Sequence, residues 1–289
     1  MENERIKVKH RSMLGETAVQ FMRKPTAVVG LVFLFIIVAM CLLAPVIAPY
    51  DYDAQNVPIK FTPPCKEYIC GTDNLGRDIF SRLLYGGRIS LMVGFVSAPC
   101  AAIIGVILGA IAAFYGGKVD NVIMRIVDVF MALPQTILAI IISAMIGTGI
   151  KGAMIAVTVA TIPRYAQAVR GPILAIRNQE FVEAATAIDA RDSRIIFRHI
   201  LPNVLSPIIV QVTMGIGSAI TMAASLSFLG LGVQPPYPEW GAMISAARVY
   251  ILGHAYMVTF PGLCIALVVL ALNLIGDGLR DALDPRLKD

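Results

Sequence analysis

The segment TAVVGLVFLFIIVAMCLLAPVIAPY, residues 26–50, contains no Asp, Glu, Lys or Arg. A helix needs about 20 apolar residues to cross the hydrocarbon core of a bilayer, so this run predicts a first transmembrane helix, which we place at residues 26–48. Further charge-poor stretches each predict one more span: residues 89–117, 129–150, 152–169, 206–232 and 249–276. The sequence therefore predicts an all-α membrane protein with six transmembrane helices.

The composition supports this class. Hydrophobic residues make up 57% of the 289 positions, and the 24 glycines bring the apolar share to roughly 65%, against about 45–50% in soluble domains. Charged residues make up only 15%, against about 25% in soluble domains. These values exclude a disordered chain, a small disulfide-rich secreted protein and an ordinary soluble enzyme.

The distribution of the 24 Lys and Arg residues predicts the orientation. With the N-terminus in the cytoplasm, 17 of them fall on inner segments and 7 on outer ones. Because cytoplasmic loops are enriched in basic residues, we expect both termini inside, with residues 1–25 as a cytoplasmic tail. Residues 49–86 then form an extracytoplasmic loop containing an interfacial helix, and residues 87–289 form a five-helix core with a cytoplasmic loop at 170–203. The net charge of +5 follows from this topology and does not require a nucleic-acid partner.

Small residues recur every four positions in the second and fifth spans, where they let helices approach closely. They are Ala101, Gly105, Gly109, Ala113 and Gly117 in the second span, and Gly215, Ala219, Ala223 and Ser227 in the fifth. The two stripes predict either packing within this chain or contact with a second membrane subunit.

Two of the five cysteines, Cys65 and Cys70, share the outer loop in the sequence CKEYIC. Because that side of the membrane is oxidising, we predict a disulfide between them, with two free thiols as the alternative. The remaining cysteines lie within spans, and the three histidines lie on different segments. The sequence therefore predicts no metal site.

The inner loop at residues 170–203 is too polar for the membrane yet rich in helix-forming residues. EFVEAATAI, residues 180–188, predicts one helix, and SRIIFRHI, residues 193–200, predicts a second, amphipathic one. We expect Asp189 and Asp192 to cap the second helix and Pro202 to end it. A short amphipathic helix at the inner surface can lie on lipid or dock into a groove of another protein.

This loop resembles the EAA motif of the membrane subunits of binding-protein-dependent ABC importers. The matching residues are Glu183, Ala184, Ala185, Asp189, His199, Leu201 and Pro202. The resemblance implies a coupling helix seated in a groove of a cytoplasmic ATPase, formed by these residues together with Arg194. Asp189 stands where the motif has Gly, and His199 where it commonly has Ile; Asp can cap the next helix where Gly would bend the chain.

Other motifs resemble the peptide and nickel permeases, and most closely the C-type subunit of dipeptide and oligopeptide permeases. They are GTDNLGRD at 71–78, KPTAVVG at 24–30, FLGLG at 228–232 and GDGLRDALDPR at 276–286. The resemblance implies a type I (MetI-like) importer core with one extra N-terminal helix, in a bacterial or archaeal inner membrane. It also implies a homologous second permease subunit, two ATPase subunits that carry ATP and Mg²⁺, and an extracytoplasmic binding protein. We expect no cofactor in this chain and a peptide substrate, with nickel or another small solute as the alternative.

Ionisable and amide side chains near the spans are candidates for the translocation pathway. Asp128, Gln135 and Arg164 are the candidates, although Asp128 and Arg164 could instead anchor helix ends at the interface, and Arg125 could neutralise Asp128. The sequence contains no GxxxxGK[ST] phosphate-binding loop and no paired catalytic groups. We therefore expect a non-catalytic transport subunit, with a secondary transporter as a remote alternative that the clustering of charge in the cytoplasmic loop disfavours.

Overall fold

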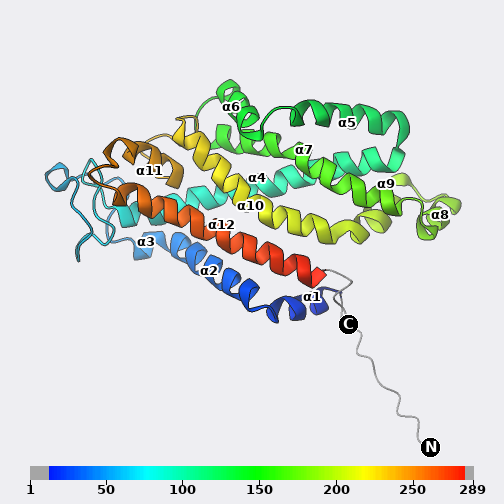
Figure 1. Ribbon diagram of the computed structural model, residues 1–289, viewed down its shortest axis with the longest axis horizontal. Helices are drawn as coiled ribbons and strands as arrows, with labels where there is room; N and C mark the ends of the chain where they lie inside the picture. The colour runs from blue at the N-terminus through cyan, green and yellow to red at the C-terminus, as the bar shows by residue number, and fades with distance from the viewer. Residues whose placement is uncertain (1–12, 284–289) are drawn as a thin grey trace, which may run out of the picture.

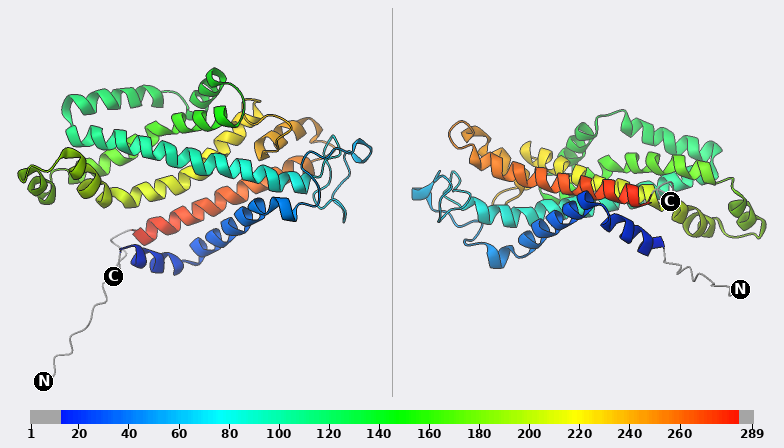
Figure 2. Two further views of the ribbon diagram at one scale, coloured as in Figure 1. Left: turned by 180° about the vertical axis from the view of Figure 1, so that it is seen from behind. Right: turned by 60° about the horizontal axis from the view of Figure 1, so that its bottom comes forward.

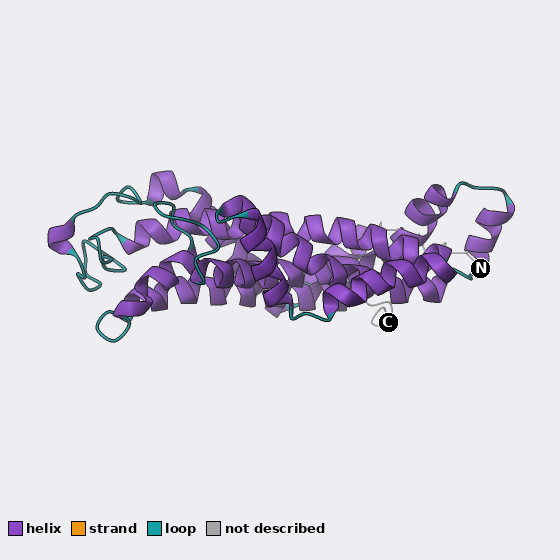
Figure 3. Ribbon diagram, turned by 90° about the horizontal axis from the view of Figure 1, so that it is seen from above, coloured by secondary structure: helices purple, strands orange, loops and turns teal. Residues whose placement is uncertain are grey.

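The structure is a computed structural model that describes residues 13–283. Within this range every regular element is helical and no strand occurs; the only strand-like pairing is an isolated bridge between Thr72 and Asp78. The helices form one elongated bundle (Figure 3). The all-α class is thus confirmed, while residues 1–12 of the predicted tail and residues 284–289 lie outside the described part of the chain.

Most of the chain is in helices that run along the long axis (Figure 1). The longer ones are α2 (Pro25–Leu42), α4 (Ile79–Tyr115), α5 (Gly117–Met131), α6 (Gln135–Ile146), α7 (Ile150–Ile176), α10 (Leu205–Phe228) and α12 (Tyr256–Leu283). The shorter ones are α1 (Met13–Met22), α3 (Ala44–Ile47), η1 (Val57–Ile59), α8 (Glu180–Ala187), α9 (Asp192–Arg194), η2 (Ile195–Ile200), η3 (Leu201–Val204), α11 (Trp240–Ala247) and η4 (Arg248–Tyr250).

The described residues contain four helical stretches long and apolar enough to cross a membrane. They are α2, α4, the continuous stretch Asp192–Phe228 that includes α10, and α12. If the bent pair α5–α6 is one span, the described residues contain five such stretches. Helix α7 is long enough with 27 residues, but it carries Lys151, Arg164 and Arg170. Each of the six predicted spans overlaps one of these helices or, for the third span, the pair α5–α6. The number of six transmembrane helices remains a prediction.

The third predicted span, residues 129–150, differs most from the structure. It is divided between α5 and α6, which meet at an angle of 90° across residues 132–134. Pro134 precedes α6, and a residue before proline is disfavoured in the helical conformation, which explains the break at this point. Residues 118–125 lie between the second and third predicted spans, yet they are helical and belong to α5, because the chain turns earlier, at Gly116 and Gly117, both with positive φ.

Four of the five small residues of the second span are buried, and Gly105 and Gly109 face α7, whereas Gly117 is exposed at the start of α5. A Cβ atom at Gly105 would lie 2.6 Å from Cβ of Tyr165, and one at Gly109 would overlap the carbonyl oxygen of Ala166. In the fifth span the corresponding residues, such as Ala219, are likewise buried within the chain. Of the two alternatives for these stripes, the structure supports packing within this chain.

The N-terminal helix α2 lies along α12 (Figure 1). A Cβ atom at Gly30 would come within 2.8 Å of Cβ of Leu274, so only glycine permits this approach. Lys24, just before α2, forms an ion pair with Asp281 near the end of α12. The added helix is therefore fixed to the last helix of the core.

The two ends of the bundle differ in character (Figures 1 and 2). The long loop between α3 and α4 lies at one end together with α11. Helices α8 and α9 protrude at the other end, and α1 and the last turns of α12 point toward that same end. We call these the loop end and the α8 end.

Candidate functional site

Residues 180–204 protrude at the α8 end, and we call them the segment at the α8 end. They contain the two helices predicted at residues 180–188 and 193–200. Helix α8 ends in a Schellman motif, in which the N–H of Ala190 donates to the carbonyl of Ala185 and the N–H of Asp189 donates to that of Thr186. Asp189 has φ +54, in the left-handed region that normally favours glycine. Asp189 thus adopts the conformation for which the related motif has Gly.

Two expectations for this segment are wrong. Asp189 and Asp192 do not cap the second helix, because the N-cap of α9 is Arg191, which makes no side-chain cap; Asp192 instead accepts a hydrogen bond of 2.8 Å from the Tyr115 hydroxyl. Pro202 does not end the helical path either. It occupies the first turn of η3, where its missing N–H is tolerated, and the chain continues directly into α10.

One face of the segment is anchored on the rest of the protein. Val182 and Ala185 of α8 are buried together with Ile195, Ile196 and Ile200. This cluster also contains residues from the ends of α4 and α7: Ala110, Ala113, Val169 and Ile173. The predicted apolar face comprised residues 195, 196, 199 and 200; the three isoleucines are buried as expected, while His199 is half-buried. The segment is held against α4 and α7 by apolar packing.

The other face of the segment is open. A hollow of about 650 Å³ is lined by Ile188, Asp189, Ala190, Arg191, Ser193, Arg194 and Phe197. Phe197 is 57% exposed and Ile188 is 79% exposed, so two large apolar side chains project from a surface that also carries two arginines. Such a surface suits a protein partner, because exposed apolar groups next to charges are typical of interfaces.

The predicted coupling residues are divided between these faces. Glu183, Ala184, Asp189, Arg194 and Pro202 are exposed, Ala185 is buried, and His199 and Leu201 are half-buried. The structure therefore places most of the set at the surface, and Ala185 in the anchor.

Two of the three predicted pathway residues lie together. Gln135, at the start of α6, donates a hydrogen bond of 3.2 Å to the carbonyl of Ala160. Gln135 and Arg164 both line a hollow of about 270 Å³ beside the α5–α6 bend. Asp128 is exposed on α5, does not line this hollow, and makes no ion pair with Arg125 among the described residues.

A two-pronged charge pair near the α8 end joins two residues that no sequence pattern identified. Arg170 of α7 donates two hydrogen bonds, of 2.6 and 2.5 Å, to the carboxylate of Asp120 in the first turn of α5. Arg177 donates to the carbonyl of Ala113 at 2.9 Å. A two-pronged Arg–carboxylate contact between helices has no signal in sequence spacing, because the partners are 50 residues apart.

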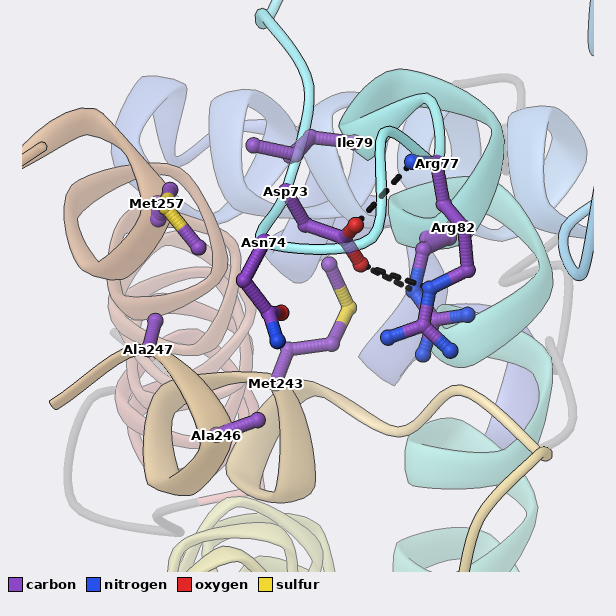
Figure 4. A pocket seen from close by; sticks show the side chains of 9 residues that line it. All are labelled: Asp73, Asn74, Arg77, Ile79, Arg82, Met243, Ala246, Ala247 and Met257. Carbon is purple, nitrogen blue, oxygen red and sulfur yellow. Dashed lines mark hydrogen bonds and ion pairs between the residues drawn. The ribbon is translucent and has the colours of Figure 1, made fainter. Parts of the chain in front are cut away.

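At the loop end the carboxylate of Asp73 lies between two arginines (Figure 4). It accepts a hydrogen bond of 2.7 Å from Nε of Arg77, and Nε of Arg82 lies 3.8 Å away. These side chains, together with Met243 and Met257, line a small cavity of about 20 Å³. Asp78 caps α4, with its Oδ2 accepting from the N–H of Ser81. The expected interfacial helix is the first part of the continuous α4.

Glu239, also not predicted, is buried at the start of α11. Its carboxylate accepts hydrogen bonds from the N–H groups of Gly241 and Ala242 and from the hydroxyl of Ser90 on α4. The indole N–H of Trp240 donates to the carbonyl of Leu83 at 3.0 Å. The burial of this charge is offset by three donors. The two N–H groups belong to the first turn of α11, while the bonds to Ser90 and Leu83 hold α11 against α4.

The predicted disulfide is not formed in the structure. Cys65 and Cys70 are both free, Cys65 on the exposed surface and Cys70 buried near Asp78 and Cys264. Burial raises the pKa of the Cys70 thiol to about 11. The two thiols lie in different environments because Cys70 faces the core cluster while Cys65 does not.

Comparisons with known proteins agree with this arrangement. Residues 105–289 match the family described as the inner membrane component of binding-protein-dependent transport systems, and residues 12–64 match the N-terminal transmembrane domain of oligopeptide transport permease C. The chain is 45% identical to the dipeptide transport system permease protein DppC of Alkalihalophilus pseudofirmus, over 93% of this chain and 88% of that protein.

Two further relatives are also named as peptide or glutathione permeases. The di/tripeptide transport system permease protein DppC of Pseudomonas aeruginosa is 43% identical, covering 96% and 94% of the two chains. The glutathione transport system permease protein GsiD of Pectobacterium atrosepticum is 45% identical, covering 93% and 90%. Among solved structures, an inward-facing form of the MetNI methionine ABC transporter matches with a TM-score of 0.59 at 21% identity, over 70% of this chain and 97% of that one, and shares its fold.

Proposed function

This chain belongs to the family of inner membrane components of binding-protein-dependent transport systems, and from that premise we propose that it is the C-type permease subunit of an ATP-driven peptide importer. It is a multi-pass protein of the inner membrane with the type I ABC permease fold. The named relatives transport dipeptides, di- and tripeptides, or glutathione, which is itself a tripeptide. These substrates favour short peptides over nickel for this chain.

We propose that the protein itself is not catalytic and works by movement. A homologous second permease would complete the translocation pathway, two cytoplasmic ATPase subunits would hydrolyse ATP with Mg²⁺, and an extracytoplasmic binding protein would deliver the peptide. This chain would require no cofactor of its own.

The observation that carries the proposal is the two-sided segment at the α8 end. Its open face offers Phe197, Ile188 and Arg194 to a partner, and its buried face packs on α4 and α7. A partner that binds the open face and moves would displace α4 and α7 together with the segment, because the close packing of the buried side chains prevents the segment from moving relative to these helices. Glu183, Ala184, Asp189, His199, Leu201 and Pro202 would form the rest of the coupling region.

The proposal is tested in proteoliposomes that contain this chain with its partner permease, ATPases and binding protein. We expect ATP-dependent uptake of radiolabelled dipeptide and no uptake of ⁶³Ni²⁺. Glu183→Lys should leave membrane insertion intact but reduce uptake per ATP hydrolysed, whereas Glu183→Gln should have a smaller effect, since it removes the charge without reversing it. Uptake of nickel instead of peptide would refute the substrate, and normal coupling in Glu183→Lys would refute the assignment of this segment.

A further inference from the structure

Another hollow, of about 510 Å³, lies between α7, α10 and α12 near the α8 end of the bundle. Its polar lining consists of Arg164, Ser206, Gln211 and Arg280. Its apolar lining includes Val210 and Met214 of α10. The volume is within the range of about 300–1,000 Å³ that is usual for small-molecule sites, and the lining contains two positive charges and no acidic side chain.

The two arginines of this hollow have no anionic partner among the described residues. Neither Arg164 nor Arg280 forms an ion pair or a side-chain hydrogen bond there. The neighbouring basic residues differ in this respect: Arg170 is paired with Asp120, and Lys24 with Asp281. Both arginine side chains are exposed, so their guanidinium groups are accessible to an anion that enters the hollow.

Arg164 connects this hollow with the one at the α5–α6 bend, because it lines both. Helix α4 lies behind α7 and α10 in the view of Figure 1 and in front of them when the molecule is turned round in Figure 2. The two hollows therefore adjoin at the Arg164 side chain, and none of the residues that line them belongs to α4.

Three hydroxyl side chains lie on the exposed side of α10, between residues 218 and 225. Ser218, Thr221 and Ser225 are exposed and lie three or four residues apart, which places them on one face of the helix. Their hydroxyls donate to the carbonyls four residues earlier, so they can face either lipid or water. Toward the α8 end the same face continues into Gln211 and Met214 of the hollow.

We propose that Arg164 and Arg280 form a binding site for the terminal carboxylate of the transported peptide, an inference that rests on the peptide substrate proposed above. A peptide has one free carboxylate whatever its side chains, so a site for that group binds peptides of different sequence. Two guanidinium groups offer donors that match carboxylate geometry, and Ser206 and Gln211 add neutral hydrogen-bonding groups beside them. The apolar residues Val210 and Met214 can contact side chains without selecting among them.

The test compares two peptides in the complete transporter. Uptake of radiolabelled Ala-Ala and of its C-terminal amide is measured with the unsubstituted chain and with the double variant Arg164→Gln/Arg280→Gln, at concentrations that saturate the binding protein for each peptide. The same binding protein serves both chains, so its own preference cancels in the ratio. We expect the double variant to lower uptake of Ala-Ala by about tenfold or more, as for loss of a charged hydrogen-bond partner, and to leave uptake of the amide within about twofold.

Two controls accompany this comparison. Arg164→Lys/Arg280→Lys keeps the charge and should restore most of the Ala-Ala uptake. Arg125→Gln removes an exposed arginine that lines neither hollow and should change neither peptide.

Each other outcome has a distinct meaning. Equal losses for the free acid and the amide overturn the carboxylate site and indicate a structural or lipid-binding function of the arginines. Unchanged uptake of both peptides overturns it as well. Failure of the unsubstituted transporter to take up either peptide overturns the proposed peptide function itself, so the two failures are distinguishable.

Discussion

Replacement of Ile200 by Ala tests whether the segment at the α8 end is rigidly anchored. Ile200 is fully buried in the cluster that joins η2 to α4 and α7. The change removes three carbon atoms, which corresponds to about 2 kcal/mol of transfer free energy, and a cavity term raises the expected loss of stability to about 2–5 kcal/mol. Phe197, three residues earlier, is 57% exposed, so Phe197→Ala should cost only about 1 kcal/mol.

The assay measures thermal unfolding of the purified protein in detergent alongside co-purification of the ATPase subunits. Ile200→Ala should lower the unfolding temperature clearly, and Ile200→Val should lower it less, in line with about 0.5–1.5 kcal/mol. Phe197→Ala should leave the unfolding temperature nearly unchanged but weaken retention of the ATPase, because it removes an apolar side chain from the open face. If Phe197→Ala destabilises the protein more than Ile200→Ala, the assignment of buried and open faces is wrong.

Three further changes test other parts of the structure. Asp120→Asn should reduce stability by about 1.5–3 kcal/mol in thermal unfolding, because it removes the charged acceptor of Arg170. An equal loss in Arg170→Gln, with no added loss in the double variant, would identify the ion pair as the cause. Maleimide should label Cys65 with or without prior reduction, because its thiol is free. Cys70 should stay unlabelled near pH 7 and gain reactivity only as the pH rises toward its pKa of about 11. Labelling of Cys65 only after reduction would contradict free thiols. Gly109→Leu should prevent accumulation of folded protein, measured by size-exclusion chromatography, because its side chain would overlap the backbone of α7, and a normal elution profile would contradict the close packing of α4 on α7.

The sequence predicts the long helices well because their signal is local. Charge-free runs and small residues at every fourth position specify both the helices and the faces that pack, as Gly105 and Gly109 show. The bend between α5 and α6 is harder to predict, since residues 129–150 form an unbroken run without Asp, Glu, Lys or Arg. Pro134 marks the place of the break, but a proline can also sit in a continuous helix, as Pro99 does in α4. The neighbouring helices decide which of the two outcomes occurs.

The functional residues likewise divide into those that a local sequence pattern identifies and those that depend on contacts between distant segments. The amphipathic pattern of residues 195–200 identifies the anchored face because the helical period alone determines it. The capping expectation for Asp189 fails because sequence reasoning treats Asp as a cap former, whereas here the backbone of Asp189 fills a left-handed position at the end of α8. The pair of Asp120 with Arg170, and the lack of an ion pair for Arg164 within residues 13–283, both depend on contacts between distant segments, so no local pattern predicts either one.

Helix α7 connects the two proposed sites. Val169 and Ile173 of α7 are buried in the cluster that anchors the segment at the α8 end, and Arg164 lies five residues before Val169 on the same helix. Five residues correspond to about 7.5 Å of helix rise, so a displacement of the anchored segment reaches Arg164 through less than two helical turns. If partner ATPases grip the open face, as proposed, their movement shifts Arg164 relative to Arg280, which lies on α12 outside the anchoring cluster. Separation of the two guanidinium groups would weaken their joint hold on a carboxylate, and the same motion that opens the pathway would then release the peptide.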